Sequence, residues 1–179
     1  MSQATIHVER ALSSTKFAPG NDCSISLTAT LDYPTPITIF TWPTIFNLKL
    51  SQKRWHFYCI DVCDNDKPIQ LNVENPGKRG GGISRQRNGP HDRYFVTFRP
   101  SEPVTITEAF ELAIRQHSEQ LKPGHRYRFG INRSKLSPHW VWTHGTREEI
   151  LTEEQELLRD HEQSQIVIHA NDGDFEVTQ

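Results

Sequence analysis

The chain has 179 residues, of which 35% are hydrophobic and 23% charged, and this composition is typical of one globular domain. Its net charge of −2 gives no general attraction to nucleic acid or acidic membranes, so neither is expected as a partner. Residues 1–10 lack the features of a secretory signal, and no segment is apolar over the roughly 18 residues that a membrane span needs. The three cysteines, Cys23, Cys59 and Cys63, form no disulfide framework, so we expect a cytoplasmic protein with free thiols.

Short runs of alternating or β-branched apolar residues predict strands through the first three quarters of the chain. We expect these strands at residues 25–31, 37–42, 55–62, 69–73, 93–98, 104–106, 110–114 and 125–131. The glycine-, proline- and arginine-rich segment 75–90 interrupts the pattern and predicts a long loop. Seven or eight short strands at regular spacing indicate an all-β fold, an immunoglobulin-like sandwich of two antiparallel sheets formed by residues 1–145.

The last residues, 146–179, predict an extension packed on the same domain. Thr146 with Glu149, and Thr152 with Gln155, match the capping box that begins a helix. We therefore expect one helix or two short ones within residues 146–163. Two apolar runs, at 166–168 and 175–177, flank an Asn-Asp-Gly turn and predict a terminal hairpin.

Four segments of the chain occur in an order that resembles a known group of proteins. They are residues 27–31, 39–46, 121–129 and 140–149. In this order they resemble small, largely uncharacterised fungal proteins with an immunoglobulin-like sandwich. The resemblance covers roughly residues 22–150 and depends on hydrophobic and turn positions. It implies a fold and a fungal origin, and it transfers no catalytic residue.

The segment 139–144 has the most unusual composition, with two indoles and two imidazoles among six residues. In an extended segment, Trp140, Trp142 and His144 share one face, so they could line an aromatic pocket with an imidazole acid or base. The candidate catalytic residues are then His139, His144 and Arg126, and the candidate ligand contacts are Trp140, Trp142, Arg128 and His125. The alternative is that both tryptophans fill the core at one end of the sandwich.

The loop 78–87 combines three consecutive glycines with arginines, and Arg85 and Arg87 are its candidate contacts to a phosphate or carboxylate. It does not match a phosphate-binding P-loop, and no aromatic residues alternate with its arginines as in nucleic-acid sites. The alternative is a solvated connection between strands. Residues 146–163 are strongly acidic, which indicates a solvated helix face or a contact with the basic loop of a second copy.

Metal and cofactor sites are not expected. His125, His139 and His144 could converge, but their spacing matches no known ligand motif. Cys59 and Cys63 share one face of a strand and are too far apart for a disulfide within it. No nucleophile motif is present either.

Two functions remain open at this point. The first is a non-catalytic module that binds a small apolar or aromatic molecule or a protein partner, which an edge strand could pair with. The second is a small cofactor-independent enzyme, a cyclase or isomerase acting on an apolar metabolite in fungal secondary metabolism. The enzyme requires an open cavity of roughly 300 Å³ with both indoles on its wall.

Overall fold

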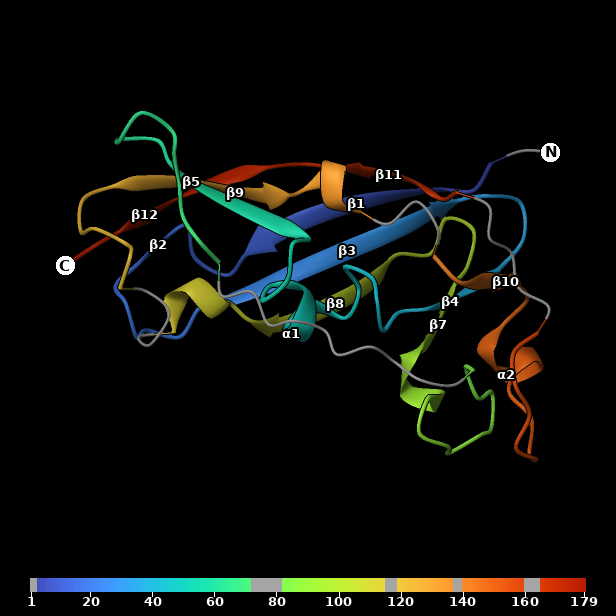
Figure 1. Cartoon of the computed structure of the whole chain (residues 1–179). Coiled ribbons are helices and arrows are strands. Elements are labelled where there is room, and N and C mark those ends of the chain that lie inside the picture. The colour runs from blue at the N-terminus through green and yellow to red at the C-terminus, as the bar shows by residue number, and fades with distance from the viewer. Residues whose placement is uncertain (1–2, 72–81, 115–118, 137–139, 160–164) are drawn as a thin grey trace.

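The computed structural model describes residues 3–71, 82–114, 119–136, 140–159 and 165–179 (Figure 1). It is mostly β, with 41% of residues in strands and 10% in helices. Three sheets are formed, and their buried residues make one main core. No helix in the described ranges is long and apolar enough to cross a membrane.

The first sheet has four strands in the order β11 (Val167–Ala170), β1 (Thr5–Leu12), β3 (Ser24–Asp32) and β8 (Val104–Ala109). β1 pairs antiparallel with β3 and parallel with β11, so the sheet is mixed. Residues of β3 alternate between buried and half-buried positions, because successive side chains of a strand point to opposite faces. On the outer face the hydroxyls of Ser26 and Thr107 lie 2.8 Å apart and bond across the β3–β8 pair.

The second sheet has five strands in the order β2 (Lys16–Phe17), β12 (Gly173–Val177), β9 (Arg126–Ile131), β5 (Phe57–Asp61) and β6 (Lys67–Pro68). β12 is parallel to β2 and antiparallel to β9, so this sheet is mixed as well. Its inward side chains include Phe57 and Cys59 on β5 and Tyr127 and Phe129 on β9, all of them buried. They face the buried side chains of the first sheet within one hydrophobic cluster, an arrangement that fits a β-sandwich.

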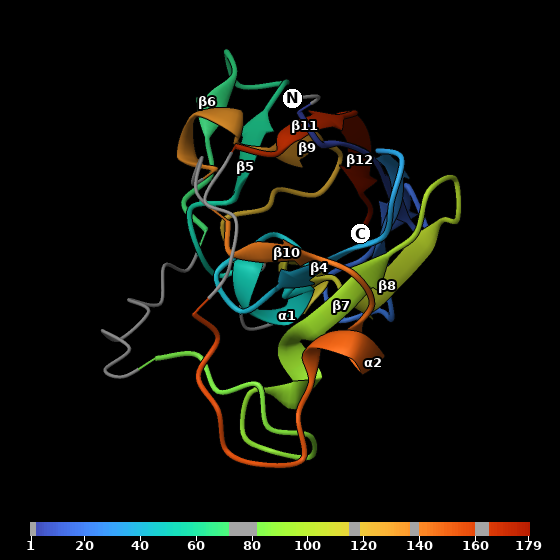
Figure 2. The same ribbon diagram turned by 90° about the vertical axis from the view of Figure 1, so that its right-hand side faces the viewer.

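The third sheet has three strands in the order β10 (Trp142–His144), β4 (Ile37–Phe40) and β7 (Phe95–Phe98). The helix α1 (Leu48–Ser51) contacts β8 of the first sheet, and α2 (Arg147–Ile150) lies beside β7 of the third sheet (Figure 2). Three short 3₁₀ turns complete the described elements, at Asp92–Tyr94, Glu111–Ala113 and Arg133–Lys135.

Most of the predicted strands are confirmed, with differences at their ends. The predicted strand at 110–114 is wrong, because residues Glu111–Ala113 form a 3₁₀ turn. Of the predicted strand at 69–73, residues 69–71 lie just after β6 (Lys67–Pro68) and residues 72–73 lie outside the described residues. β1 was not predicted, although Ile6 and Val8 alternate with polar residues; the inward position that follows them holds a charged residue, Arg10. That guanidinium is buried and lies 5.8 Å from the centre of the Phe129 ring, which accommodates its charge between the sheets.

The predicted C-terminal extension differs more. The capping box of Thr146 and Glu149 is formed, but α2 ends at Ile150, and Thr152 donates its hydroxyl hydrogen bond to the Glu154 carbonyl instead of starting a second helix. The predicted terminal hairpin is wrong. β11 belongs to the first sheet and β12 to the second, so the two C-terminal strands complete different sheets. Purely antiparallel sheets are wrong for the same reason, since each of these strands makes a parallel pair.

Candidate functional sites

The two tryptophans of the segment 139–144 pack in the core. Trp140 and Trp142 are only 2% and 3% exposed, and the Trp140 ring meets the Phe46 ring edge to face at 5.4 Å. His144 is exposed, with its ring 5.2 Å from Trp142, while His139 lies outside the described residues. The tryptophans therefore take the alternative role of core residues, and they leave no open wall for the ligand pocket that the enzyme hypothesis requires.

The two arginines assigned to that pocket point away from it. Strand alternation turns Tyr127 and Phe129 toward the core and Arg126 and Arg128 toward solvent. Arg128 Nε donates to Asp174 Oδ1 at 3.0 Å, and Arg126 Nε lies 3.7 Å from the other oxygen of the same carboxylate. Since β9 and β10 belong to different sheets, the predicted cluster of arginines and tryptophans does not form.

Of the predicted loop 78–87, residues 78–81 lie outside the described residues, and residues 82–87, here called the arginine loop, pair with the acidic segment of the same molecule. Arg85 forms an ion pair with Glu156, and Arg87 Nε lies 2.9 Å from Glu153 Oε1. Backbone bonds join the segments too, with the Thr152 N–H donating to the Arg85 carbonyl at 2.9 Å. The guanidinium groups that were predicted to bind an external anion are therefore paired with carboxylates of the same chain. Two of the acidic side chains that suggested a contact with a second copy therefore pair within one chain.

A narrow cleft of about 120 Å³ opens between the end of α1, the segment 69–71, the 3₁₀ turn at Glu111–Ala113, and residues 119–120. Phe110 and Phe129 lie at its base, with their rings edge to face at 5.1 Å. Its volume is well below the roughly 300 Å³ of a usual small-molecule pocket, so a single-ring compound is the largest kind that suits it. Sequence reasoning missed this cleft, because its walls come from segments that are far apart in the chain.

Two glutamine side chains brace the walls of this cleft. Gln52 is buried; its Nε2 donates to the Ala109 carbonyl at 2.9 Å, and its Oε1 accepts from the Glu111 N–H at 3.0 Å. Gln120 makes the same two kinds of bond to the backbone of Gln70, at 2.7 and 3.1 Å. Four hydrogen bonds thus join the walls of the cleft in the chain without a ligand, and such bonds reduce the ordering cost of binding.

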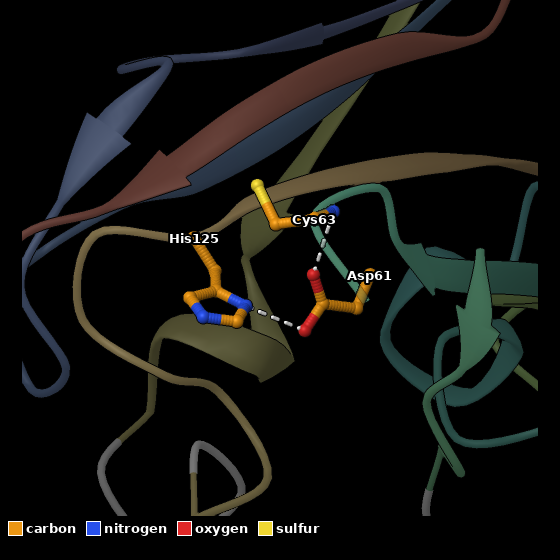
Figure 3. Close-up of side chains that lie close together, drawn as sticks. All are labelled: Asp61, Cys63 and His125. Carbon is orange, nitrogen blue, oxygen red and sulfur yellow. Dashed lines mark hydrogen bonds and ion pairs between the residues drawn. The ribbon is translucent and has the colours of Figure 1, made fainter. Parts of the chain in front are cut away.

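A separate polar cluster lies where β5 ends and β9 begins, and contains Asp61, Cys63 and His125 (Figure 3). The Asp61 side chain is 2% exposed; its Oδ1 accepts the Cys63 N–H at 3.0 Å, and its Oδ2 lies 2.8 Å from His125 Nδ1. The Cys63 thiol is exposed, and its sulfur accepts the Arg126 N–H at 3.4 Å. A buried carboxylate thus holds an imidazole beside an accessible thiol.

Burial and nearby charges shift the pKa values of three groups around this cluster. Burial, reinforced by the charge of Asp61, raises the pKa of the Cys59 thiol to about 12, so that Cys59 stays protonated at neutral pH. Burial also raises the pKa of Tyr127, whose phenol oxygen accepts the Lys122 N–H at 2.7 Å. The Lys122 ammonium, 3.1 Å from the Asp64 carboxylate, lowers the pKa of Asp64.

Of the three residues in this cluster, sequence reasoning had named only His125 as a site residue. The antiparallel register places Asp61 opposite Tyr127, two residues from His125, and the turn after β5 returns Cys63 to the same end. An Asp-x-Cys pattern after an apolar strand was the available signal, but it identifies no partner 62 residues later. Comparison with protein-family models and with curated proteins finds no match to this chain.

Proposed function

We propose that this protein is a non-catalytic binding module of immunoglobulin-like sandwich type, and that the cleft above Phe110 and Phe129 binds a compact, mostly apolar or aromatic molecule. The observation that carries the proposal is the pair of glutamine side chains, Gln52 and Gln120, whose four hydrogen bonds join the walls of the cleft. Small-molecule sites in proteins are largely preformed, with apolar walls and a few placed polar groups.

The lining of the cleft supports a ligand with one polar end. Leu71, Leu112 and the two phenylalanines supply its apolar part. At the rim, Lys53 Nζ lies 3.6 Å from Glu111 Oε1, and both side chains are largely buried. This ion pair can offer a donor and an acceptor to a hydroxyl or an amine of the ligand. Because Lys53 and Glu111 are paired with each other, they are better suited to orienting a bound ligand than to acting as a catalytic acid and base.

Titration with phenol and with indole tests the proposal, using the methyl signals of leucines in an NMR spectrum. Phenol should shift the Leu71 and Leu112 methyls in a saturable way, and indole should do so more weakly because its two fused rings fit a cleft of about 120 Å³ less well. The Leu157 methyls should not move, since that side chain is 47% exposed and does not line the cleft.

A cleft-filling variant separates specific binding from surface contact. Leu71→Trp should weaken phenol binding by about tenfold or more, because the larger ring occupies the ligand volume. The matched control, Leu157→Trp, makes the same change on an exposed leucine and should leave the affinity unchanged. Phenol binding that survives in Leu71→Trp, or an absence of saturable shifts in the natural chain, would overturn the proposal.

A further inference from the structure

The cluster at the end of β5 carries a second inference, which is independent of the cleft. We propose that Asp61, Cys63 and His125 form a binding site for a divalent ion of the zinc type. The candidate donor atoms, one each from a carboxylate, a thiol and an imidazole, all lie within 4.8 Å of one another. Figure 3 shows the Asp61 oxygens and the His125 ring brought together below the Cys63 sulfur.

The donor types select the ion. Carboxylate oxygen, thiolate sulfur and imidazole nitrogen are the three ligands that Zn²⁺ takes in proteins. Mg²⁺ and Ca²⁺ favour sites made only of oxygen, and Cu⁺ favours sites richer in sulfur. Three protein donors leave a fourth tetrahedral position open. Because Cys63 is exposed and the His125 side chain is 29% exposed, that position faces solvent and admits water or an external ligand.

Only small movements convert the present arrangement into a coordination site. Metal–ligand bonds of about 2.0–2.3 Å place the donors of a tetrahedral site about 3.3–3.8 Å apart. The His125 Nδ1 to Asp61 Oδ2 distance of 2.8 Å would therefore lengthen slightly, and the sulfur would move inward by about 1 Å at most. Cys63 lies in the turn after β5, where rotation of its exposed side chain suffices.

The orientation of the imidazole favours metal binding over nucleophilic catalysis. A catalytic thiol must reach one ring nitrogen while the orienting carboxylate holds the other. In Figure 3 the Nδ1 edge faces Asp61, the second nitrogen points away from the cluster, and the Cys63 sulfur is not on that side. The carboxylate and thiol donors both lie within 4.8 Å of the imidazole donor, which suits a shared ion.

The surroundings hold the donors in place. The Cys63 N–H bond to Asp61 Oδ1 fixes one donor relative to another, and the Arg126 N–H bond to Cys63 Sγ positions the sulfur. Outer hydrogen bonds of this kind orient metal ligands in known sites. Cys59 is buried, with its side chain turned into the core, and is not a competing donor.

Cobalt(II) titration of the purified full chain is the direct test, because a thiolate bound to Co²⁺ gives a charge-transfer band in the near ultraviolet. One equivalent of Co²⁺ should produce this band together with the intense visible bands of tetrahedral cobalt. One equivalent of Zn²⁺ should remove both by displacement. Absence of the charge-transfer band at saturating Co²⁺ would overturn the proposal.

Variants assign the signal to this cluster. Cys63→Ser should remove the charge-transfer band, and His125→Ala should weaken Co²⁺ and Zn²⁺ binding by roughly tenfold or more. Both residues are at least partly exposed, so these variants should fold even if changes at Asp61 do not.

Two matched controls should bind metal normally. Cys23→Ser alters a buried thiol elsewhere in the chain. His169→Ala removes one ring of the stacked His7–His169 pair, whose imidazoles could also bind the metal ion. A charge-transfer band that persists in Cys63→Ser, or metal binding that is lost in His169→Ala instead of His125→Ala, would contradict the assignment. Binding of phenol in the cleft should not depend on any of these changes.

Discussion

The segment around Trp140 and the turn around Cys63 are opposites in sequence and in structure. The first is rich in indole and imidazole, yet its two tryptophans are buried among core residues. The second is ordinary in sequence, yet it brings a buried carboxylate, an imidazole and an exposed thiol together. Large aromatic side chains contribute most by leaving water, so their concentration marks a core at least as often as a site. Donor groups become a site only when strand register aligns them.

The largest expected effect tests the first half of this comparison. Trp140→Ala should lower the free energy of unfolding by about 3–5 kcal/mol, because it leaves a cavity against Phe46 in the main core. Chemical denaturation followed by circular dichroism would measure the change. Trp140→Phe, which retains an aromatic ring, should cost clearly less. A loss below about 1 kcal/mol in Trp140→Ala would show that the indole is not core material.

An intermediate effect on stability is expected at Asp61, in the cluster around Cys63. Asp61→Ala should destabilise the protein by about 1–3 kcal/mol, because the Cys63 N–H and the His125 imidazole lose their shared acceptor. It should also weaken Zn²⁺ binding, whereas Trp140→Ala should leave Zn²⁺ affinity nearly unchanged as long as the chain is folded. Asp61→Asn keeps one carbonyl acceptor and should be less destabilised.

A double-mutant cycle shows whether the Asp61 effect belongs to the cluster. If the carboxylate acts through the imidazole, Asp61→Ala and His125→Ala should not be additive in denaturant unfolding. Additive losses of unfolding free energy would mean that Asp61 stabilises only the turn after β5. The turn around Cys63 would then be a structural element, as the segment around Trp140 is.

The same physical reasoning explains what sequence could and could not predict. Alternation at Ile25, Leu27 and Leu31 predicts β3 well, because a period of two specifies which side chains face the core. It does not specify the neighbouring strand or its direction. The C-terminal strands β11 and β12 were therefore recognised as strands but were assigned to each other, although each joins a different sheet.

For the sites too, the local sequence pattern identifies single residues but not the partners that strand pairing brings to them. From the sequence no metal site was expected at His125, which was predicted as a ligand contact in the aromatic pocket. Its partners were not, because Asp61 reaches it only through the β5–β9 register. The cleft was beyond reach for a similar reason, since Gln52 and Gln120 brace backbone segments distant from them in the chain.

The smallest expected effect concerns a third segment, the arginine loop, which like the tryptophans is conspicuous in sequence. Arg87→Ala should change the free energy of unfolding by only about 0–1 kcal/mol, because its ion pair with Glu153 is largely exposed. Arg87→Glu should cost somewhat more, through repulsion from Glu153, and adding Glu153→Arg should restore the natural stability in low salt. The rescue should fade as salt is raised, since screening weakens exposed pairs. If Arg87→Ala instead lowered the free energy of unfolding by several kcal/mol, the arginine loop would contribute strongly to stability. It would then resemble the tryptophans, which were predicted to bind a ligand but stabilise the core.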